Sequence, residues 1–348
     1  MYNYIIIKVN TDWNIFMTNS NNKQFEVGII GAGAITTTLH LPLLSAMKNT
    51  KPKFIADLFE PKELGKLYKI NSYKIDNLTN LPNCDIILIA TPVGVRNEYI
   101  NEFSKRGIPI FTEKPFALDI DTHEQFLSNS KFLGCNYMKI WYNTSKMFEK
   151  IITNNTFGEI KKIIVNEGGI VGKTNRGPET YQSNKKLSGG GVIMESSCHT
   201  LSVFSSIFEN LSVEKSEIIW VDELDVEAKI KFNVNSKSNF PLEYKITLIH
   251  PIQNETKIYF ENFYISFDHT APSSSFSICQ LNGEKIFELQ NDCNYANSSQ
   301  QAYYLTWQNF IETLKDKDNI NTKELTSFQT TKLISEIFQI GEQQWKLE

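Results

Sequence analysis

The sequence predicts an α/β protein in two parts: an N-terminal doubly wound parallel sheet, and a C-terminal α+β part with a large, mostly antiparallel open sheet. Two observations predict this division. Short apolar runs alternate with helical patterns between residues 25 and 142, which is typical of parallel strands covered on both faces. Beyond about residue 155, strands such as 226–232 alternate polar and apolar side chains, which indicates antiparallel strands with one wetter face.

The expected organisation has three segments: an N-terminal extension (1–24), the parallel-sheet domain (25–142) and a second domain (143–348). The helices at the end of the second domain are candidates to pack back on the first. The extension is polar and rich in asparagine. Two interpretations of it stay open, a loosely docked tail and a chain whose natural start is Met17.

Composition excludes several classes of protein. The 348 residues carry 35 Lys+Arg and 39 Asp+Glu, a net charge of −4, so the basic field that nucleic-acid binding requires is missing. No apolar run reaches the roughly 18 residues of a transmembrane helix. The five cysteines form no CxxC pair, which favours a reducing compartment and gives no zinc-ligand pattern. A globular cytoplasmic protein without nucleic-acid or membrane partners is expected.

The predicted elements of the first domain begin with a buried strand, residues 25–30. A helical segment with several leucines follows, and Pro42 is expected to bend or restart it. Strands and helices then alternate at the spacing of βαβ units. The further strands are 53–58, 85–90, 108–112 and 132–141, and the helices between them include 98–105 and 121–127.

The second domain is predicted to contain six strands and three helices. One helix interrupts the strands and two close the chain. The strands are 160–167, 226–234, 242–249, 256–267, 276–280 and 285–289, and the helices are 191–208, 300–314 and 325–340.

A glycine turn joins the first strand to the first helix. Gly31 permits the tight turn, and Gly33 lets the backbone approach a pyrophosphate that rests on the helix N-terminus, at Ala34 and Ile35. The third position of the fingerprint is Thr36 rather than glycine or alanine, which is expected to loosen the packing of helix on strand. The turn predicts a dinucleotide site, with a purely structural turn as the alternative.

The fingerprint also requires an acid at the end of the second strand, for the ribose diol. Asp57 and Glu60 are the candidates, and a solvated loop carboxylate is the alternative for either. Glu60 is preferred because Asp57 would cut the strand short. A carboxylate repels a 2′-phosphate and no arginine follows it, so NAD is favoured as cofactor, with NADP possible.

Two further segments stand at the carboxyl ends of later strands, where ligands of parallel sheets bind. They are Thr91-Pro92 and Glu113-Lys114. A lysine in such a cleft can hold its charge near a developing alkoxide. Lys114 is therefore a candidate catalytic residue, and an ordinary surface lysine is the alternative.

A run of three glycines leads into the helix that carries Glu195 and His199. These residues are four apart, so they are expected to share a helix face. A carboxylate beside a histidine fixes its tautomer, and the histidine can then accept a hydroxyl proton. A structural histidine is the alternative. The other four histidines are interpreted as structural or surface residues: His40, His123, His250 and His269.

In this order the motifs resemble those of the glucose–fructose oxidoreductase / inositol dehydrogenase / rhizopine catabolism (Gfo/Idh/MocA) family. The segments that carry the resemblance are 27–33, 40–42, 90–92, 113–115, 158–160 and 189–191, followed by Glu195 and His199. The resemblance implies a Rossmann domain, an open sheet whose outer face makes a homodimer or homotetramer, and hydride transfer between a sugar or nucleotide-sugar carbon and nicotinamide.

The resemblance also implies roles for single residues. Lys114 and His199 correspond to the catalytic lysine and histidine, and Glu195 would position His199. Substrate-lining residues correspond to Met138 and Lys139. The nicotinamide side of the cleft would be lined by Thr91, Pro92 and Glu113.

Three departures from the family pattern keep other functions open. Glu195 replaces an aspartate, Arg96 replaces a histidine, and Lys139 starts a segment that has two arginines in the family. They suggest an unusual substrate or reduced activity. The alternatives are a non-catalytic dinucleotide sensor and a dehydrogenase of a non-sugar cyclic alcohol. The charged loop 171–187, with Lys173, Arg176, Lys185 and Lys186, would meet a nucleotide-sugar diphosphate or form a solvated face.

Overall fold

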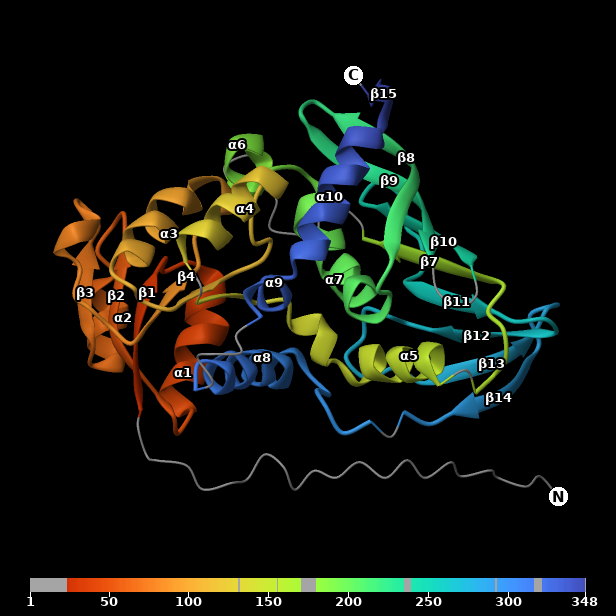
Figure 1. Ribbon diagram of the computed structural model, residues 1–348, viewed down its shortest axis with the longest axis horizontal. Coiled ribbons are helices and arrows are strands. Elements are labelled where there is room, and N and C mark those ends of the chain that lie inside the picture. The colour runs from red at the N-terminus through yellow and green to blue at the C-terminus, as the bar shows by residue number, and fades with distance from the viewer. Residues whose placement is uncertain are drawn as a thin grey trace.

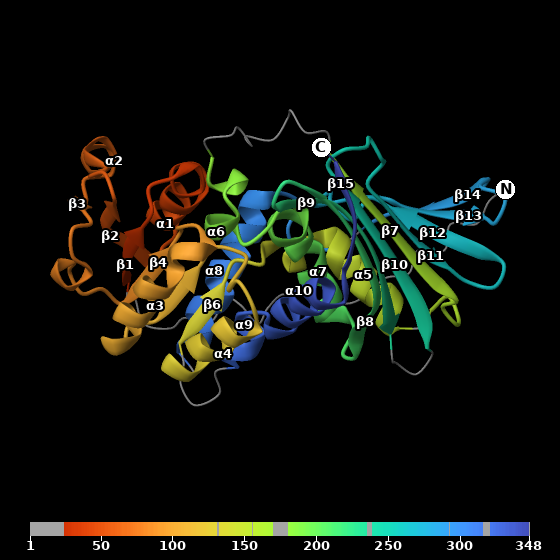
Figure 2. The same cartoon turned by 90° about the horizontal axis from the view of Figure 1, so that it is seen from above.

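The two predicted sheets lie at opposite ends of the long axis, with helices between them (Figures 1 and 2). This computed structural model describes residues 24–130, 132–154, 156–169, 180–234, 239–291, 293–315 and 321–347. The interpretation of Met17 and most of the extension therefore fall outside the described residues. The predicted fold class, a parallel sheet followed by a large, mostly antiparallel one, is confirmed.

The first sheet has six parallel strands in the order β3-β2-β1-β4-β5-β6. Strand β4 and the last four residues of β1 are apolar and buried because helices cover both faces of the sheet. The strand order reverses between β1 and β4, which places a ligand crevice at their carboxyl ends. The strands are β1 (Phe25–Ile30), β2 (Thr50–Asp57), β3 (Asn71–Lys74), β4 (Ile86–Ile89), β5 (Ile110–Thr112) and β6 (Leu133–Cys135), and the helices are α1 (Leu41–Ala46), α2 (Lys62–Tyr68), α3 (Arg96–Lys105) and α4 (Ile120–Asn129).

A helix from the far end of the chain completes the core of this sheet. Trp307 and Phe310 of α8 (Ser299–Thr313) are buried against Phe111 of β5, with ring centroids 4.3 and 5.1 Å from that of Phe111. Figure 1 shows α8 running beneath α1. The two parts of the chain are therefore joined through a shared apolar core.

The second sheet has nine strands in the order β14-β13-β12-β11-β7-β10-β9-β8-β15. Its neighbours are antiparallel except β7 with β10 and β8 with β15. Three helices cover the face turned toward the first sheet: α5 (Asn143–Thr153), α7 (Cys198–Ile207) and α10 (Phe328–Ile340) (Figure 2). The strands are β7 (Lys162–Gly168), β8 (Leu211–Val221), β9 (Leu224–Val234), β10 (Phe240–Thr247), β11 (Glu255–Tyr259), β12 (Phe263–Phe267), β13 (Phe276–Gln280), β14 (Lys285–Leu289) and β15 (Glu342–Leu347).

The structure corrects several predicted elements. The expected strand 132–141 is only β6, because a 3₁₀ turn, η5 (Met138–Trp141), follows it. The expected strand 256–267 is a hairpin of two strands, β11 and β12. The helix predicted at 191–208 starts with a π-turn, η7 (Ile193–Ser197), and continues as α7. Strands β3, β8 and β15 were not predicted.

A buried histidine makes the folded state sensitive to acid. His123 of α4 is fully buried, with Nδ1 2.8 Å from the Thr331 hydroxyl and Nε2 2.9 Å from the Thr326 hydroxyl. Burial lowers its pKa to about 3. Below pH ~6.5 the unfolded chain binds a proton that the folded chain excludes, so the free energy of unfolding falls by up to about 1.4 kcal/mol per pH unit.

Urea unfolding between pH 7.5 and 5 checks this expectation. His123→Gln should make the loss of stability toward pH 5 smaller. The exposed His250 offers the matched variant, His250→Gln, which should leave the slope unchanged. Equal slopes for both variants would contradict the assignment.

Candidate functional site

The glycine turn at the end of β1 has the geometry that dinucleotide binding needs. Gly31 has φ +97°, and a Cβ there would stand 2.8 Å from the Ala90 carbonyl oxygen, so only glycine fits. A Cβ on Gly33 would meet nothing within 4 Å, and the turn therefore faces open space. Thr36 is buried and its hydroxyl donates to the Gly31 carbonyl at 2.7 Å, so the expected loosening is wrong. The helix instead widens into a π-turn, η2 (Thr36–His40).

The acid that reaches this turn is Asp57, and the geometry does not support the preference for Glu60. Strand β2 does end at Asp57, whose carboxylate accepts the Ala32 and Leu58 backbone N–H groups, both at 2.6 Å. Glu60 lies apart, over α2 and β3, where it accepts the Ser72 hydroxyl at 3.0 Å. Asp57 and the glycine turn thus fit a dinucleotide.

A buried arginine holds the next two strand ends together. Nη2 of Arg96 donates to the Thr91 carbonyl after β4 at 2.8 Å, and Nη1 donates to the Glu113 carbonyl after β5 at 2.7 Å. Nη1 also contacts the carbonyls of Pro115 and Phe116. The arginine that departs from the family pattern therefore fixes the turn that carries Lys114.

A second buried network, which the sequence analysis missed, fixes Glu113. Its carboxylate lies 2.7 Å from both His40 Nε2 and Asn136 Nδ2. The Trp307 indole N–H donates to His40 Nδ1 at 3.0 Å, so His40 is the neutral tautomer that donates from Nε2 to Glu113. Burial raises the pKa of Glu113, but these partners more than offset it, and the net pKa is lowered. The pairing joins residues 267 positions apart, which no local motif reveals.

Lys114 projects from this turn onto the π-turn η7. Its ammonium donates to the Glu195 carbonyl at 2.8 Å and lies 3.5 Å from the Glu195 carboxylate. Burial by itself lowers the pKa of Lys114, but the acidic groups around it, Cys198 and Glu195 foremost, outweigh burial and raise it. Burial also raises the pKa of the Cys198 thiol to about 12, so near neutral pH the thiol is uncharged and the carboxylates hold the lysine charged.

Glu195 does not position His199, which corrects the prediction from their spacing. Glu195 lies in the π-turn η7, whose backbone bonds run i to i+5, and His199 lies in the helix α7 that follows it. The contacts of the described residues join the Glu195 side chain to Lys114, and His199 Nδ1 is buried without a hydrogen-bond partner among them. Burial, together with Lys114 and Lys139, lowers the pKa of His199 well below its usual value.

An aspartate on β9 anchors the start of this helical segment. The buried Asp225 carboxylate accepts the backbone N–H groups of Gly191 and Ile193 at 2.5 and 2.6 Å. A Cβ on Gly191 would lie 1.9 Å from the Asp225 carbonyl oxygen. The glycine run therefore allows η7 to begin directly against β9. This contact fixes the positions of Glu195 and His199 relative to the larger sheet.

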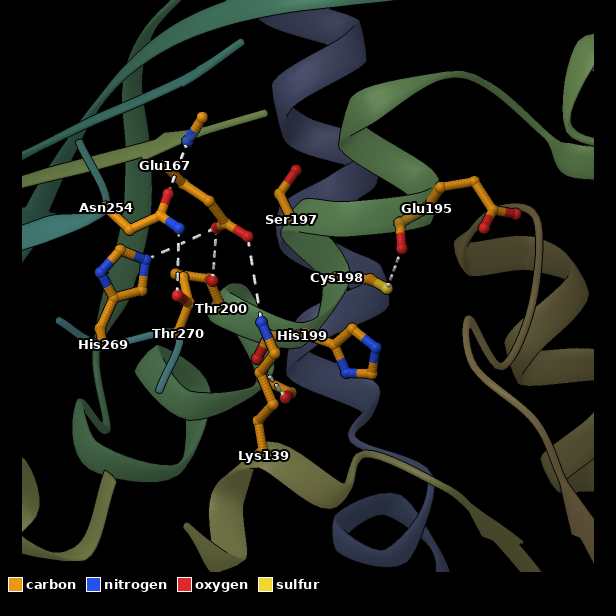
Figure 3. A network of polar contacts seen from close by, with 12 residues as sticks. Lys139, Glu167, Glu195, Ser197, Cys198, His199, Thr200, Asn254, His269 and Thr270 are labelled. Carbon is orange, nitrogen blue, oxygen red and sulfur yellow. Dashed lines mark hydrogen bonds and ion pairs between the residues drawn. The ribbon is translucent and has the colours of Figure 1, made fainter. Parts of the chain in front are cut away.

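Met138 and Lys139 lie outside the cleft that the other predicted residues line. Met138 is buried in an apolar cluster with Tyr142 and Tyr303. Lys139 lines a small separate cavity and pairs with Glu167 of β7, at 3.9 Å (Figure 3). The substrate-lining role that the resemblance implied for both residues is not supported by this placement.

One cleft brings the remaining predicted residues together. It encloses about 1500 Å³, counting the solvent space at its mouth, and runs from the glycine turn to α7. The predicted residues that line it are Gly31, Gly33, Ala34, Ile35, Asp57, Thr91, Pro92, Glu113, Lys114, Glu195 and His199, and Leu58, Tyr181 and Tyr303 join them without having been predicted. A residue set that holds a dinucleotide thus leads to a lysine and a histidine at the far end.

Of the remaining predicted charges, Lys185 and Lys186 lie in the described part of the chain, and neither lines this cleft. The Lys185 ammonium stacks over the Trp220 ring, 4.9 Å from its centroid, and Lys186 is exposed. Lys173 and Arg176 fall outside the described residues. Of the four other histidines, His40 and His123 are buried, His250 is exposed, and His269 lies 3.6 Å from Glu167. In the part of the chain that is described, no helix is long and apolar enough to span a bilayer.

Comparison with known proteins finds similarity to oxidoreductases. Residues 25–138 match the model of an oxidoreductase family with an NAD-binding Rossmann fold. The oxidoreductase YrbE of Bacillus subtilis is 29% identical over 187 residues, which are 51% of this chain and 52% of YrbE. Inositol 2-dehydrogenase of Rhizobium meliloti is 22% identical over 207 residues, 56% of this chain and 59% of that enzyme. The matches span little more than half the length of these relatives.

Solved structures share the whole fold. KijD10, a 3-ketoreductase from Actinomadura kijaniata crystallised with NADP and TDP-benzene, has a TM-score of 0.77 at 14% identity, covering 92% of this chain and 99% of its own. An aldose–aldose oxidoreductase from Caulobacter crescentus has a TM-score of 0.74 at 16% identity, covering 91% and 97%. At these identities the likeness establishes the fold of both parts of the chain.

Proposed function

Since residues 25–138 match the model of an oxidoreductase family with an NAD-binding Rossmann fold, we propose that this chain is an NAD-dependent oxidoreductase acting on the secondary alcohol of a sugar, nucleotide-sugar or cyclitol. The observation that carries the proposal is convergence. Lys114 follows β5 and His199 lies 85 positions later on α7, yet both line the far end of the cleft that starts at the glycine turn. A nicotinamide bound along this cleft would supply the hydride acceptor.

The two side chains have complementary protonation states for this chemistry. The lowered pKa of His199 keeps its imidazole neutral near pH 7, so it can accept the hydroxyl proton of the substrate. The raised pKa of Lys114 keeps its ammonium charged, so it can stabilise the alkoxide as the carbon loses hydride and becomes a carbonyl. In the reverse direction Lys114 polarises the carbonyl and protonated His199 returns the proton.

Asp57 supports NAD over NADP as the preferred cofactor. Its carboxylate already lies at the glycine turn, where a 2′-phosphate would meet like charge. Asp57→Ala is expected to weaken NADH binding about tenfold and to narrow the difference between NADH and NADPH. Fluorescence titration with each cofactor measures both effects. Glu60→Ala is the matched variant and should change neither affinity, whereas a larger effect at Glu60 would reverse the assignment.

The substrate class is supported by the relatives and by the polar end of the cleft. The purified chain should be incubated with NAD or NADP and a panel of myo-inositol, aldoses, levoglucosan and TDP-linked sugars, while reduced nicotinamide is followed by absorbance. We expect at least one compound of the panel to reduce NAD or NADP, and we expect the variant His199→Gln to lose this activity. Reduction by none of them contradicts the proposal.

A non-catalytic dinucleotide sensor is the second candidate. It is favoured by the hydrogen bond that Lys114 makes to Glu195 and by His199 Nδ1, which has no hydrogen-bond partner among the described residues. Tight NADH binding with no turnover of any substrate would favour it. A cyclic alcohol outside the sugars remains the other substrate class, and the same panel extended to cyclohexanediols separates it.

We also propose a homodimer or homotetramer through the outer face of the larger sheet, as the resemblance implies. That face carries alternating charges, including Lys229, Lys231 and Glu243. Light scattering should give about two or four times the mass of the 40.0 kDa chain, and the mass of a single chain would contradict the proposal. The five cysteines all lie in the described part of the chain and form no disulfide there, which supports a reducing compartment such as the cytoplasm.

A further inference from the structure

Glu195, the carboxylate nearest in sequence to His199, pairs with Lys114. A different group must therefore position the histidine if it acts as a base. Glu167 of β7, whose side chain is 12% exposed, is a carboxylate that bonds to α7 through Thr200. It lies on the inner face of the larger sheet, outside the cofactor cleft, and neither spacing nor resemblance points to it. Figure 3 shows it above Lys139, with His199 on the far side of that lysine.

Glu167 joins four elements of the fold. Its Oε2 accepts the Thr200 hydroxyl of α7 and the Tyr244 hydroxyl of β10, both at 2.7 Å. His269 Nε2 lies 3.6 Å from the same oxygen, and Lys139 Nζ of η5 lies 3.9 Å from Oε1. Burial raises the pKa of Glu167, but Lys139, His269 and Thr200 more than offset it, so the carboxyl is ionised at neutral pH.

Two of these partners act on His199. Thr200 is the next residue along α7, so the bond from its hydroxyl to Glu167 fixes the helix at the point where His199 leaves it. Lys139 reaches toward Glu167 from the opposite side and lies close enough to His199 to influence its charge. Glu167 therefore holds both the backbone and the charged neighbour of the histidine.

The charges around His199 make an anion necessary once it has taken a proton. Lys114 from the turn after β5 and Lys139 from η5 both disfavour the imidazolium, and Glu167 from β7 is the carboxylate that favours it. On its own element, Glu195 is engaged by Lys114 and Cys198 is a neutral thiol. His269 and Tyr244 face Glu167 from the sheet.

We propose that Glu167 is a positioning residue for His199: it fixes α7 through Thr200, restrains Lys139, and supplies the negative charge that protonated His199 requires. The role rests on the proposed function, in which His199 accepts the substrate proton. In this proposal Glu167 of β7 takes the positioning role that the sequence spacing predicted for Glu195.

The test is a titration of His199 by NMR in the full chain labelled at histidine, with the His199 signal identified by its loss in His199→Gln. Lys139→Met should move the midpoint of His199 upward, into a range where the protein is folded. Adding Glu167→Gln to that background should move it down again, by on the order of one pH unit. The double variant carries neither charge of the Lys139–Glu167 pair, which favours folding, and a cooperative thermal unfolding transition should show that it is folded.

Two further variants make the result specific. Glu195→Gln in the same background should shift the midpoint less than Glu167→Gln does. Glu255→Gln on β11, whose carboxylate pairs with Lys257 and Ser266, should not shift it. A midpoint unmoved by Glu167→Gln, or moved more by Glu195→Gln, overturns the proposal.

Kinetics separate this inference from the proposed function. With a substrate from the panel, Glu167→Gln should lower kcat about tenfold with little change in the KM for NAD, and Thr200→Ser should retain more rate than Thr200→Val. The titration needs neither cofactor nor substrate. If Glu167→Gln shifts the His199 midpoint but the protein turns over no substrate, only the proposed function is contradicted. If the protein turns over a substrate but the midpoint does not shift, only the role of Glu167 is contradicted.

Discussion

Replacing Lys114 by methionine is expected to lower the rate of hydride transfer about 10²–10³-fold, the effect of removing one donor to a developing oxyanion. Methionine keeps the length of the side chain but removes the ammonium that lies 2.8 Å from the Glu195 carbonyl. Binding of NADH should persist, because Gly31 and Asp57 are untouched. Steady-state kinetics and NADH fluorescence measure the two quantities separately.

Two controls protect this result. Lys114→Met leaves the Glu195 carboxylate without its cation, so Lys114→Met/Glu195→Gln shows whether loss of rate follows from loss of charge or from misfolding. The exposed Lys105 of α3 gives the matched substitution, Lys105→Met, which should retain full rate. A wild-type rate in Lys114→Met would remove this lysine from the chemistry.

Replacing Asp225 by alanine is expected to lower the free energy of unfolding by about 3–4 kcal/mol, because two buried N–H groups lose a charged acceptor. Those groups belong to Gly191 and Ile193, at the start of the segment that carries His199. Asp225→Asn retains one acceptor and should lose less. Urea denaturation at pH 7.5 measures the difference.

The neighbouring turn supplies the control for Asp225. Glu223 is exposed between β8 and β9, and Glu223→Ala should change the stability by less than about 0.5 kcal/mol. Activity gives a second readout, since the anchor sets the position of Glu195 and His199. Equal stability of the Asp225 and Glu223 variants would show that the glycine run, not the aspartate, fixes this segment.

Features that are local in the chain were predictable from the sequence. The strand, glycine turn and helix at 25–46 are contiguous, and the need for glycine at Gly31 arises within them. Strand ends were harder. The choice between Asp57 and Glu60 depended on where β2 stops, and the three residues of chain beyond that strand are enough to move a carboxylate out of the cleft.

Contacts between distant segments were not predictable from spacing. The Glu195 side chain pairs with Lys114, 81 positions away, and a helical pattern does not distinguish the π-turn that carries Glu195 from an α-helix. The pair His40–Trp307 forms only when α8 packs on the first sheet, and the pair Lys139–Glu167 forms only when η5 meets β7 of the second sheet. The hydrophobic periodicity of the sequence therefore predicts the fold class, whereas the ion pairs of the site depend on the tertiary structure.

The packing of α8 on the first sheet has a consequence for synthesis on the ribosome. The N-terminal sheet ends at β6, but Trp307 and Phe310, which seal Phe111, are translated about 170 residues later. At roughly 5–20 residues per second, that interval lasts about 10–35 seconds. During this time the nascent sheet presents an open aromatic surface, so a chain truncated before α8 should aggregate or recruit chaperones rather than persist as an independent nucleotide-binding unit.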